Sequence, residues 1–199
     1  MSATIYLEGG GDSKELHARC REGFRKLLES SGFAGRMPRL VACGGRGEAY
    51  DDFKVAHREA GPAEYVALLI DSEEPVANLE TTWEHLRQRD GWRTPSGAAD
   101  RQVLFMTTCM ETWIISDRQA LAEHYGQALQ ASALPPLDDL EQRPRDDVQD
   151  RLVQATQRCP NAYAKGKRSF AILGMLDPVT LESHLPSFSR VRRILKDSL

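Results

Sequence analysis

The chain has 199 residues, a formal charge of −3 at pH 7 and 41% hydrophobic residues. This length is enough for one hydrophobic core with additional elements, whereas two full domains would be cramped. The negative charge argues against a protein that holds nucleic acid through a general positive field, because such binding relies on clustered lysine and arginine. Local basic patches remain compatible with it.

Cysteine spacing and the N-terminal sequence indicate a soluble, cytoplasmic protein. The four cysteines lie far apart and form no Cys-x-x-Cys pair, which disfavours a zinc knuckle or a disulfide framework. The N-terminus has no basic segment followed by a long apolar stretch, and no later apolar run approaches the length of a membrane span. We therefore expect a reducing compartment and no membrane partner.

The first predicted elements are a strand, a helix and a second strand. Residues 3–8 are apolar, aromatic or β-branched and stop at three glycines, which is typical of a short buried strand. A helix that runs to about residue 32 follows, with Asp12 or Ser13 as its cap. Residues 39–43 form the second predicted strand.

Further strands and helices continue this alternation. A helix is predicted near 48–60, before the uniformly apolar residues 65–70, which suit a central strand covered on both faces. A helix over 76–90 and a strand over 101–107 come next. Strands that alternate with helices predict an α/β fold of the Rossmann-like kind, with a mostly parallel sheet flanked by helices.

The last part of the chain has a mainly helical pattern and ends in an amphipathic helix near 187–198. The sequence shows no internal repeat and no convincing linker. We therefore predict a metal-binding core over residues 1–117 and a helical C-terminal elaboration over residues 118–199, packed on that core.

Acidic residues follow two of the predicted strands. Glu8 ends the first strand, and Asp71 and Glu73 come directly after the third. In a parallel sheet the loops at the carboxyl ends of the strands converge, so these carboxylates can meet. Mg²⁺ prefers such oxygen ligands, and the glycines after Glu8 leave room for a metal or a phosphate near the backbone. The sequence thus predicts a Mg²⁺ site that would also accept Mn²⁺.

Structural alternatives exist for these residues. Glu8 could cap the following helix or pair with Lys14, and Asp71 could cap the helix after it. The glycines behind Glu8 and the carboxylates crowded beside Asp71 favour the metal site. The segment Gly44-Gly45-Arg46-Gly47 lacks the spacing of a nucleotide-binding loop, so a turn is predicted there.

Two short motifs resemble those of toprim domains. Glu8-Gly9-Gly10-Gly11-Asp12 and Asp71-Ser72-Glu73 resemble the glutamate and DxD motifs found in topoisomerases, bacterial primases, recombination proteins and overcoming-lysogenization-defect nucleases. Residues 110–117 and 163–167 are similar to segments of a bacterial toprim-like family that includes the nuclease effectors of PARIS-type anti-phage systems. The second motif departs from the pattern, because Glu replaces the second Asp and lengthens that arm by one methylene.

The resemblance implies roles for individual side chains. It implies a toprim-like fold in which Glu8 is a metal ligand or general base, Asp71 is the main ligand, and Glu73 binds directly or through water. Glu111 either reaches the metal or pairs with an arginine.

Two lysines are implied as charge-neutralising residues. Either Lys165 or Lys167 would neutralise charge on a scissile phosphate. Other basic residues could contact a nucleic-acid backbone or form a solvated face: Arg168, Arg190, Arg192, Arg193 and Lys196.

These features support two functional hypotheses. The first is a magnesium-dependent endonuclease acting on DNA or RNA, tRNA included, that serves as a toxic effector of anti-phage abortive infection. Its implied partner is an ABC-type or overcoming-lysogenization-defect-type ATPase, and a homodimer is compatible with it. The second is a non-catalytic toprim-fold subunit that regulates or assembles with such an ATPase. A processing ribonuclease is a third role, within the enzyme class.

Overall fold

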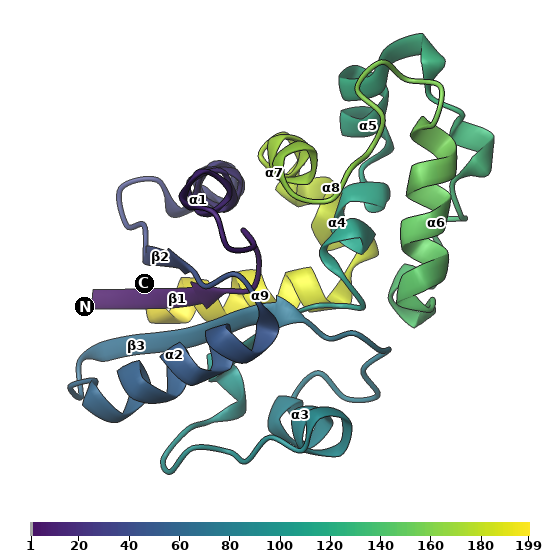
Figure 1. Cartoon of the computed structure of the whole chain (residues 1–199). Helices are drawn as coiled ribbons and strands as arrows, with labels where there is room; N and C mark the ends of the chain where they lie inside the picture. Colours follow the sequence, from purple (N-terminus) through teal and green to yellow (C-terminus); the bar gives the residue numbers. More distant parts are fainter. Residues whose placement is uncertain (1) are drawn as a thin grey trace.

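The computed structural model describes residues 2–199, except for the side chain of Lys167. In this part of the chain, four parallel strands form one sheet in the order β2-β1-β3-β4 (Figure 1). The predicted α/β fold with a parallel sheet and a helical C-terminal region is therefore confirmed. The strands are β1 (Ser2–Leu7), β2 (Arg39–Ala42), β3 (Glu64–Asp71) and β4 (Val103–Met106).

The strand register brings the carboxyl ends of the strands to one edge of the sheet. Leu7, the last residue of β1, is level with Ala42 on β2 and Leu69 on β3. Strand β3 continues for two residues beyond Leu69, so that Asp71 pairs with Met106 at the end of β4. This register places the residue after β1 and the last residue of β3 at the same edge.

Helices cover both faces of the sheet. Strand β3 supplies Ala67 and Leu69 to one apolar cluster and Val66, Leu68 and Ile70 to the other, because successive side chains of a strand point to opposite faces. The first face packs against α1 (Lys14–Leu28) and α9 (Pro186–Ser198), and the second against α2 (Arg46–Glu59) and α3 (Thr82–Asp90) (Figure 1).

The remaining helices lie beyond the carboxyl edge of the sheet. In Figure 1 the arrow of β1 points toward the side where α4 and α6 stand, while α9 runs back behind the strands. These helices are α4 (Met110–Ser116), α5 (Arg118–Tyr125), α6 (Arg145–Thr156), α7 (Lys167–Leu173) and α8 (Pro178–His184). Short 3₁₀ turns cover Asp100–Gln102, Gly126–Ala128, Ala131–Ala133 and Leu140–Gln142, and a π-type turn covers Glu29–Phe33.

The start of the third helix differs from the prediction. The sequence suggested a helix from residue 76, but α3 begins only at Thr82, and residues 76–81 form a loop. The reason is tertiary: the carboxylate of Asp100 accepts a hydrogen bond from the Trp83 backbone N–H at 2.9 Å. A distant side chain therefore satisfies a free donor of the first helical turn, a contact that local sequence does not reveal.

Candidate metal centre

Glu8 is fixed at the carboxyl edge of the sheet by backbone and side-chain contacts. Its N–H donates to the Leu69 carbonyl at 3.0 Å, which continues the β1–β3 pairing. Its Oε2 accepts from the Asp71 N–H at 3.1 Å and lies 3.5 Å from Nη1 of Arg46. The side chain thus points across the strand ends toward β3, and it does not pair with Lys14.

The glycines after Glu8 allow the backbone of the turn after β1 to lie close to the backbone of the turn after β2. Gly9 and Gly44 exchange two backbone hydrogen bonds, at 2.8 and 3.0 Å, which join the turns after β1 and β2. A Cβ on Gly44 would lie 2.7 Å from the Gly11 carbonyl oxygen, and its φ of +84° disfavours other residues. Gly44 and Gly45 therefore form a turn as predicted, but the prediction was wrong for Arg46 and Gly47, which already belong to α2.

Asp71 ends β3 and is almost completely buried. Its side chain is 5% exposed, and Oδ1 accepts from the Met110 N–H at the start of α4 at 2.8 Å. Burial raises the pKa of Asp71, and the nearby carboxylates of Glu8 and Glu111 raise it further. Asp71 therefore does not cap α3, the helix after it, and its carboxylate faces the other acidic residues.

Glu73 has an unusual backbone and two basic partners. Its φ is +69°, in the left-handed region, and its N–H donates to the Thr108 carbonyl at 2.8 Å. The carboxylate pairs with Arg145 at the start of α6 and lies 3.5 Å from Nη2 of Arg89. A ligand oxygen of Glu73 still lies within 4.8 Å of those of Glu8 and Asp71. Three of the four predicted metal ligands are therefore brought together, whereas Glu111 is not part of this group.

Three arginines surround this centre, and sequence analysis assigned none of them to it. Arg46 donates to the Asp71 carbonyl oxygen and pairs with Asp90 at 2.8 Å, and its guanidinium lies 5.0 Å from the Trp92 ring centroid. The sequence did offer a hint for Arg46, because this residue directly follows the glycines of the turn after β2 and begins α2. Arg89 and Arg145 had none, since they come from helices whose packing only the fold reveals.

Glu111 is buried beside Asp71, outside the group of three. Its side chain is 1% exposed and accepts hydrogen bonds from the Tyr163 hydroxyl and from Gln149 Nε2, the latter at 3.2 Å. Burial and the adjacent Glu111 raise the pKa of Tyr163. The helical C-terminal region therefore holds Glu111 in place.

A cavity of about 350 Å³ opens next to the carboxylates. Glu8, Asp71 and Glu111 form part of its wall, and Lys165 contributes an exposed side chain to it. Glu73 instead borders a separate hollow with Arg145. Lys167 is the first residue of α7, and its side chain lies outside the described residues. Of the two predicted lysines, Lys165 is thus placed beside the centre.

Comparison with known families gives one match. The family described as a domain of unknown function, DUF4276, matches residues 7–196. The chain belongs to the DUF4276 family. The match begins one residue before Glu8 and spans the whole acidic centre, together with the helical region that surrounds it. No curated protein and no solved structure matches the chain.

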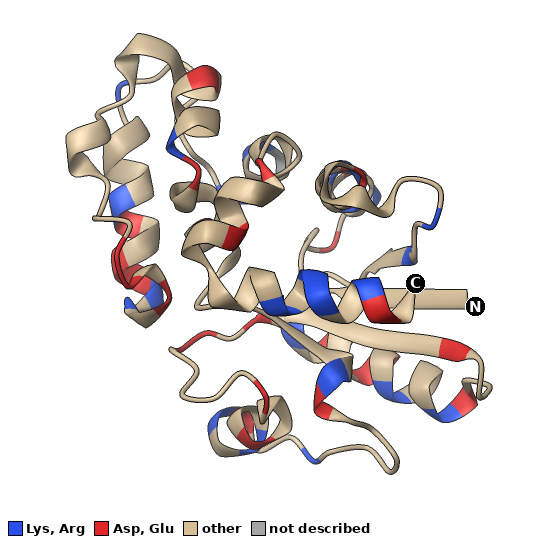
Figure 2. Cartoon of the chain, turned by 180° about the vertical axis from the view of Figure 1, so that it is seen from behind, with Lys and Arg blue, Asp and Glu red and all other residues tan. Residues whose placement is uncertain are grey.

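The basic C-terminal helix of this DUF4276 chain is engaged with the protein itself. Figure 2 shows bands of Lys and Arg along α9, seen from behind. Arg190 is buried and donates to the Val103 carbonyl at 2.9 Å, while Arg192 and Arg193 form ion pairs with Glu182 and Glu80. Arg190 and Arg192 are therefore held within the fold, whereas Arg193 stays exposed together with its partner Glu80.

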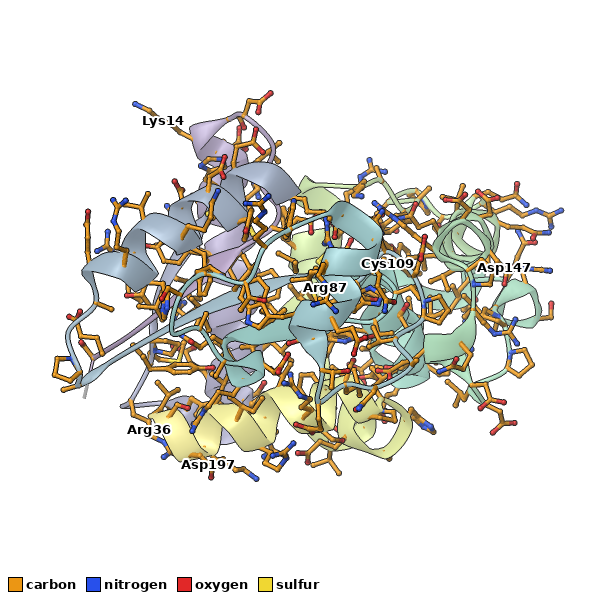
Figure 3. The ribbon with its side chains drawn as sticks, turned by 90° about the horizontal axis from the view of Figure 1, so that it is seen from below. Lys14, Arg36, Arg87, Cys109, Asp147 and Asp197 are labelled. Carbon is orange, nitrogen blue, oxygen red and sulfur yellow. The ribbon has the colours of Figure 1, made fainter. Side chains whose placement is uncertain are left out.

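In this chain α4 contacts β4 as well as the outer helices α5, α6, α7 and α8. In Figure 3, seen from below, Cys109 at the start of α4 lies between Arg87 of α3 and Asp147 of α6 along the long axis of the view. None of the helices described in residues 2–199 is both long and apolar enough to cross a membrane.

Proposed function

We propose that this DUF4276 protein is a metal-dependent nuclease that cleaves phosphodiester bonds. The observation that carries the proposal is the meeting of Glu8, Asp71 and Glu73, whose ligand oxygens lie within 4.8 Å of one another at the carboxyl edge of a parallel sheet. Ligands and catalytic residues of open α/β sheets collect at this edge. The order and position of the carboxylates also agree with the glutamate and acidic-pair motifs of toprim domains.

The donor set suits Mg²⁺ or Mn²⁺. All three side chains offer hard carboxylate oxygens, and Mg²⁺ is commonly held by a few carboxylates with waters and substrate phosphate. Burial raises the pKa of Asp71 most and the charges of Glu8 and Glu111 raise it further, so a divalent cation beside it would favour the ionised carboxylate. When bound, the ion would polarise a phosphoryl oxygen and lower the pKa of a coordinated water.

Individual residues of the chain would bind the metal, act as general base or neutralise charge on the phosphate. Asp71 would be the main ligand, Glu8 a ligand or the general base, and Glu73 a ligand reached directly or through water. Lys165, and Arg145 where it is released from Glu73, would neutralise charge on the scissile phosphate. Lys167 remains a further proposed contact.

The biological setting is part of the same proposal. By its toprim resemblance, the chain would be a cytoplasmic effector of anti-phage defence, alone or as a homodimer. An ABC-type or overcoming-lysogenization-defect-type ATPase would control it, and the target would be DNA or RNA, tRNA included. The formal charge of −3 supports control by a partner, because the free protein attracts nucleic acid weakly.

A cleavage assay with isosteric variants tests the proposal. Purified protein, with and without the ATPase, is incubated with DNA and RNA in Mg²⁺, in Mn²⁺ and in chelator. We expect metal-dependent cleavage that falls by about 100-fold or more in Asp71→Asn and Glu8→Gln, since even residues that only support metal ligands cost about 10–100-fold.

Glu74→Gln provides the matched control, because Glu74 is an exposed carboxylate in the same loop. It should keep wild-type activity. Cleavage that persists unchanged in Asp71→Asn would contradict the metal assignment.

A second candidate is a non-catalytic subunit that binds the ATPase. The ion pairs of Glu8 with Arg46 and of Glu73 with Arg145 and Arg89 favour it, because arginines already neutralise two of the three carboxylates. Calorimetric titration with Mn²⁺ separates the two functions. A non-catalytic subunit would bind the ATPase and take up no metal, whereas a nuclease would bind metal through Asp71.

A further inference from the structure

The cavity beside the acidic centre has an apolar side as well as a polar one. Leu16 of α1, Met106 at the end of β4, Met110 of α4 and Phe170 of α7 all contribute to its wall. Its volume of about 350 Å³ lies at the small end of the range for ligand pockets, about 300–1,000 Å³. A Mg²⁺ site needs neither this volume nor this apolar surface, so the cavity has room for an organic group.

We propose that this cavity receives one unpaired nucleobase of the substrate. The inference rests on the proposed nuclease function, because it assigns the phosphate next to that base to the metal centre. Glu8 and Asp71 belong both to the acidic group and to the cavity wall, so a nucleotide can lie across the two. The substrate class is then single-stranded or looped nucleic acid.

The carboxylates of the cavity disfavour a backbone phosphate inside it. Its wall carries the carboxylates of Glu8, Asp71 and Glu111, which in the ionised form repel anions and accept hydrogen bonds. A base is neutral, and most bases carry amino donors that suit such acceptors. Lys165 is exposed and can meet the phosphate at the rim of the cavity.

The shape of the site requires that the base is unpaired. A base in a duplex is stacked and paired, so enzymes that enclose a base act on single strands or extrude the base first. Apolar and aromatic side chains hold bases by contact with their faces, largely independent of sequence. Leu16, Met110 and Phe170 offer such surface here, from three different helices.

Oligonucleotide binding to the wild type and to a variant whose cavity is filled by a larger side chain tests this inference. The probe is a short oligonucleotide with a central 2-aminopurine, prepared as DNA and as RNA, single-stranded and in perfect duplex, with Ca²⁺ present. Leu16→Trp fills the cavity from a half-buried position, and Ala18→Trp adds the same side chain at an exposed position of α1. Thermal unfolding and Mn²⁺ titration establish that both variants fold and keep the metal centre.

We expect the wild type to bind the single strand at least about tenfold more tightly than the duplex. This factor corresponds to the binding free energy that stacking of one base contributes. Leu16→Trp should abolish this difference and the fluorescence change, and Ala18→Trp should preserve both. Equal affinity for the duplex, or unchanged binding by Leu16→Trp, would overturn the inference.

The cleavage assay separates this inference from the nuclease proposal. Metal-dependent cleavage of duplex and single strand at equal rates would refute the base pocket alone. Selective binding of the single strand that Leu16→Trp abolishes, without cleavage in Mg²⁺ or Mn²⁺, would support the pocket and refute the nuclease.

Discussion

At the scale of single residues, Asp71 shows how strongly the fold changes a carboxylate. Its side chain is 5% exposed and lies near Glu8 and Glu111, and both burial and these charges raise its pKa. The Met110 N–H bond and the neighbouring Arg145 and Lys165 act in the opposite direction. The net rise means that a proton competes with any cation for this site.

Metal affinity should therefore increase with pH. Because the folded-state pKa of Asp71 is raised, a metal must displace a proton below that pKa and meets a free carboxylate above it. Mn²⁺ titration of the wild type should show an affinity that rises with pH and levels off once Asp71 is ionised. Glu74→Gln should show the same curve, and a pH-independent affinity would contradict this role of Asp71.

At the scale of elements, the contact between α1 and α7 depends on one glycine. A Cβ on Gly23 would lie 2.5 Å from the backbone carbonyl oxygen of Phe170. That oxygen cannot move without its helix, and the same helix brings Phe170 to the cavity wall, next to Lys165 and Ser169. The spacing of α1 and α7 therefore sets the shape of the cavity.

Gly23→Ala should destabilise the protein although alanine has a higher helix propensity than glycine. The gain in helix propensity is about 1 kcal/mol, and the clash with Phe170 should exceed it, giving a net loss of about 1–3 kcal/mol. Gly47→Ala in α2 is the matched control, because no atom lies within 4 Å of its added Cβ. Urea unfolding measures both variants, and equal gains in stability would contradict the tight contact.

A buried carboxylate in the 3₁₀ turn Leu140–Gln142, against the start of α9, makes stability depend on pH. Glu141 accepts a hydrogen bond from the Ser187 N–H at 3.0 Å, and burial raises its pKa from 4.5 to about 7. The folded state then holds the proton more tightly than the unfolded state. Its contribution is complete below about pH 4.5 and is lost as the pH rises through 7, at a cost on the order of 3 kcal/mol.

Glu141→Gln should remove this pH dependence, because the amide oxygen still accepts from Ser187 and cannot ionise. We expect the free energy of unfolding of the wild type to fall between pH 4.5 and 8 relative to the variant. Unfolding in urea at several pH values measures the difference. Parallel curves for the two proteins would show that Glu141 does not titrate in this range.

At the scale of the whole molecule, the C-terminal region contributes to both the core and the candidate site. Helix α9 packs on the sheet with Val191, Ile194 and Leu195, all at most 3% exposed. The same region supplies Arg145 to Glu73 and Tyr163 to Glu111. The boundary predicted after residue 117 thus falls between the four-stranded sheet and α9, the C-terminal helix that covers one face of that sheet.

A fragment of residues 1–117 should not fold on its own. Each large apolar side chain of α9 contributes about 1.5–3 kcal/mol by burial, so the loss of several approaches the whole stability of a domain, about 5–15 kcal/mol. Circular dichroism and thermal unfolding should show no cooperative transition for the fragment. Addition of a fragment covering 118–199 should restore it, and a cooperative transition of 1–117 alone would contradict the shared core.

Sequence patterns were sufficient for much of the fold. The strands and most helix positions followed from apolar runs, glycines and caps, because these signals act over a few neighbouring residues. The start of α3 at Thr82 did not follow, since Asp100 decides it from a distance. Sequence likewise predicted Glu8, Asp71 and Glu73 together, because parallel strands bring their carboxyl ends to one edge.

The sequence by itself thus determined the parallel α/β architecture and the carboxylates at its edge. Only the tertiary structure decided what surrounds them: the arginine partners of Glu8 and Glu73, the burial of Asp71 and the cavity. The physical reason is the separation along the sequence of the residues that interact. Strand and helix patterns are local, whereas pKa values, ion pairs and cavities depend on side chains that come together from distant helices only when the chain packs.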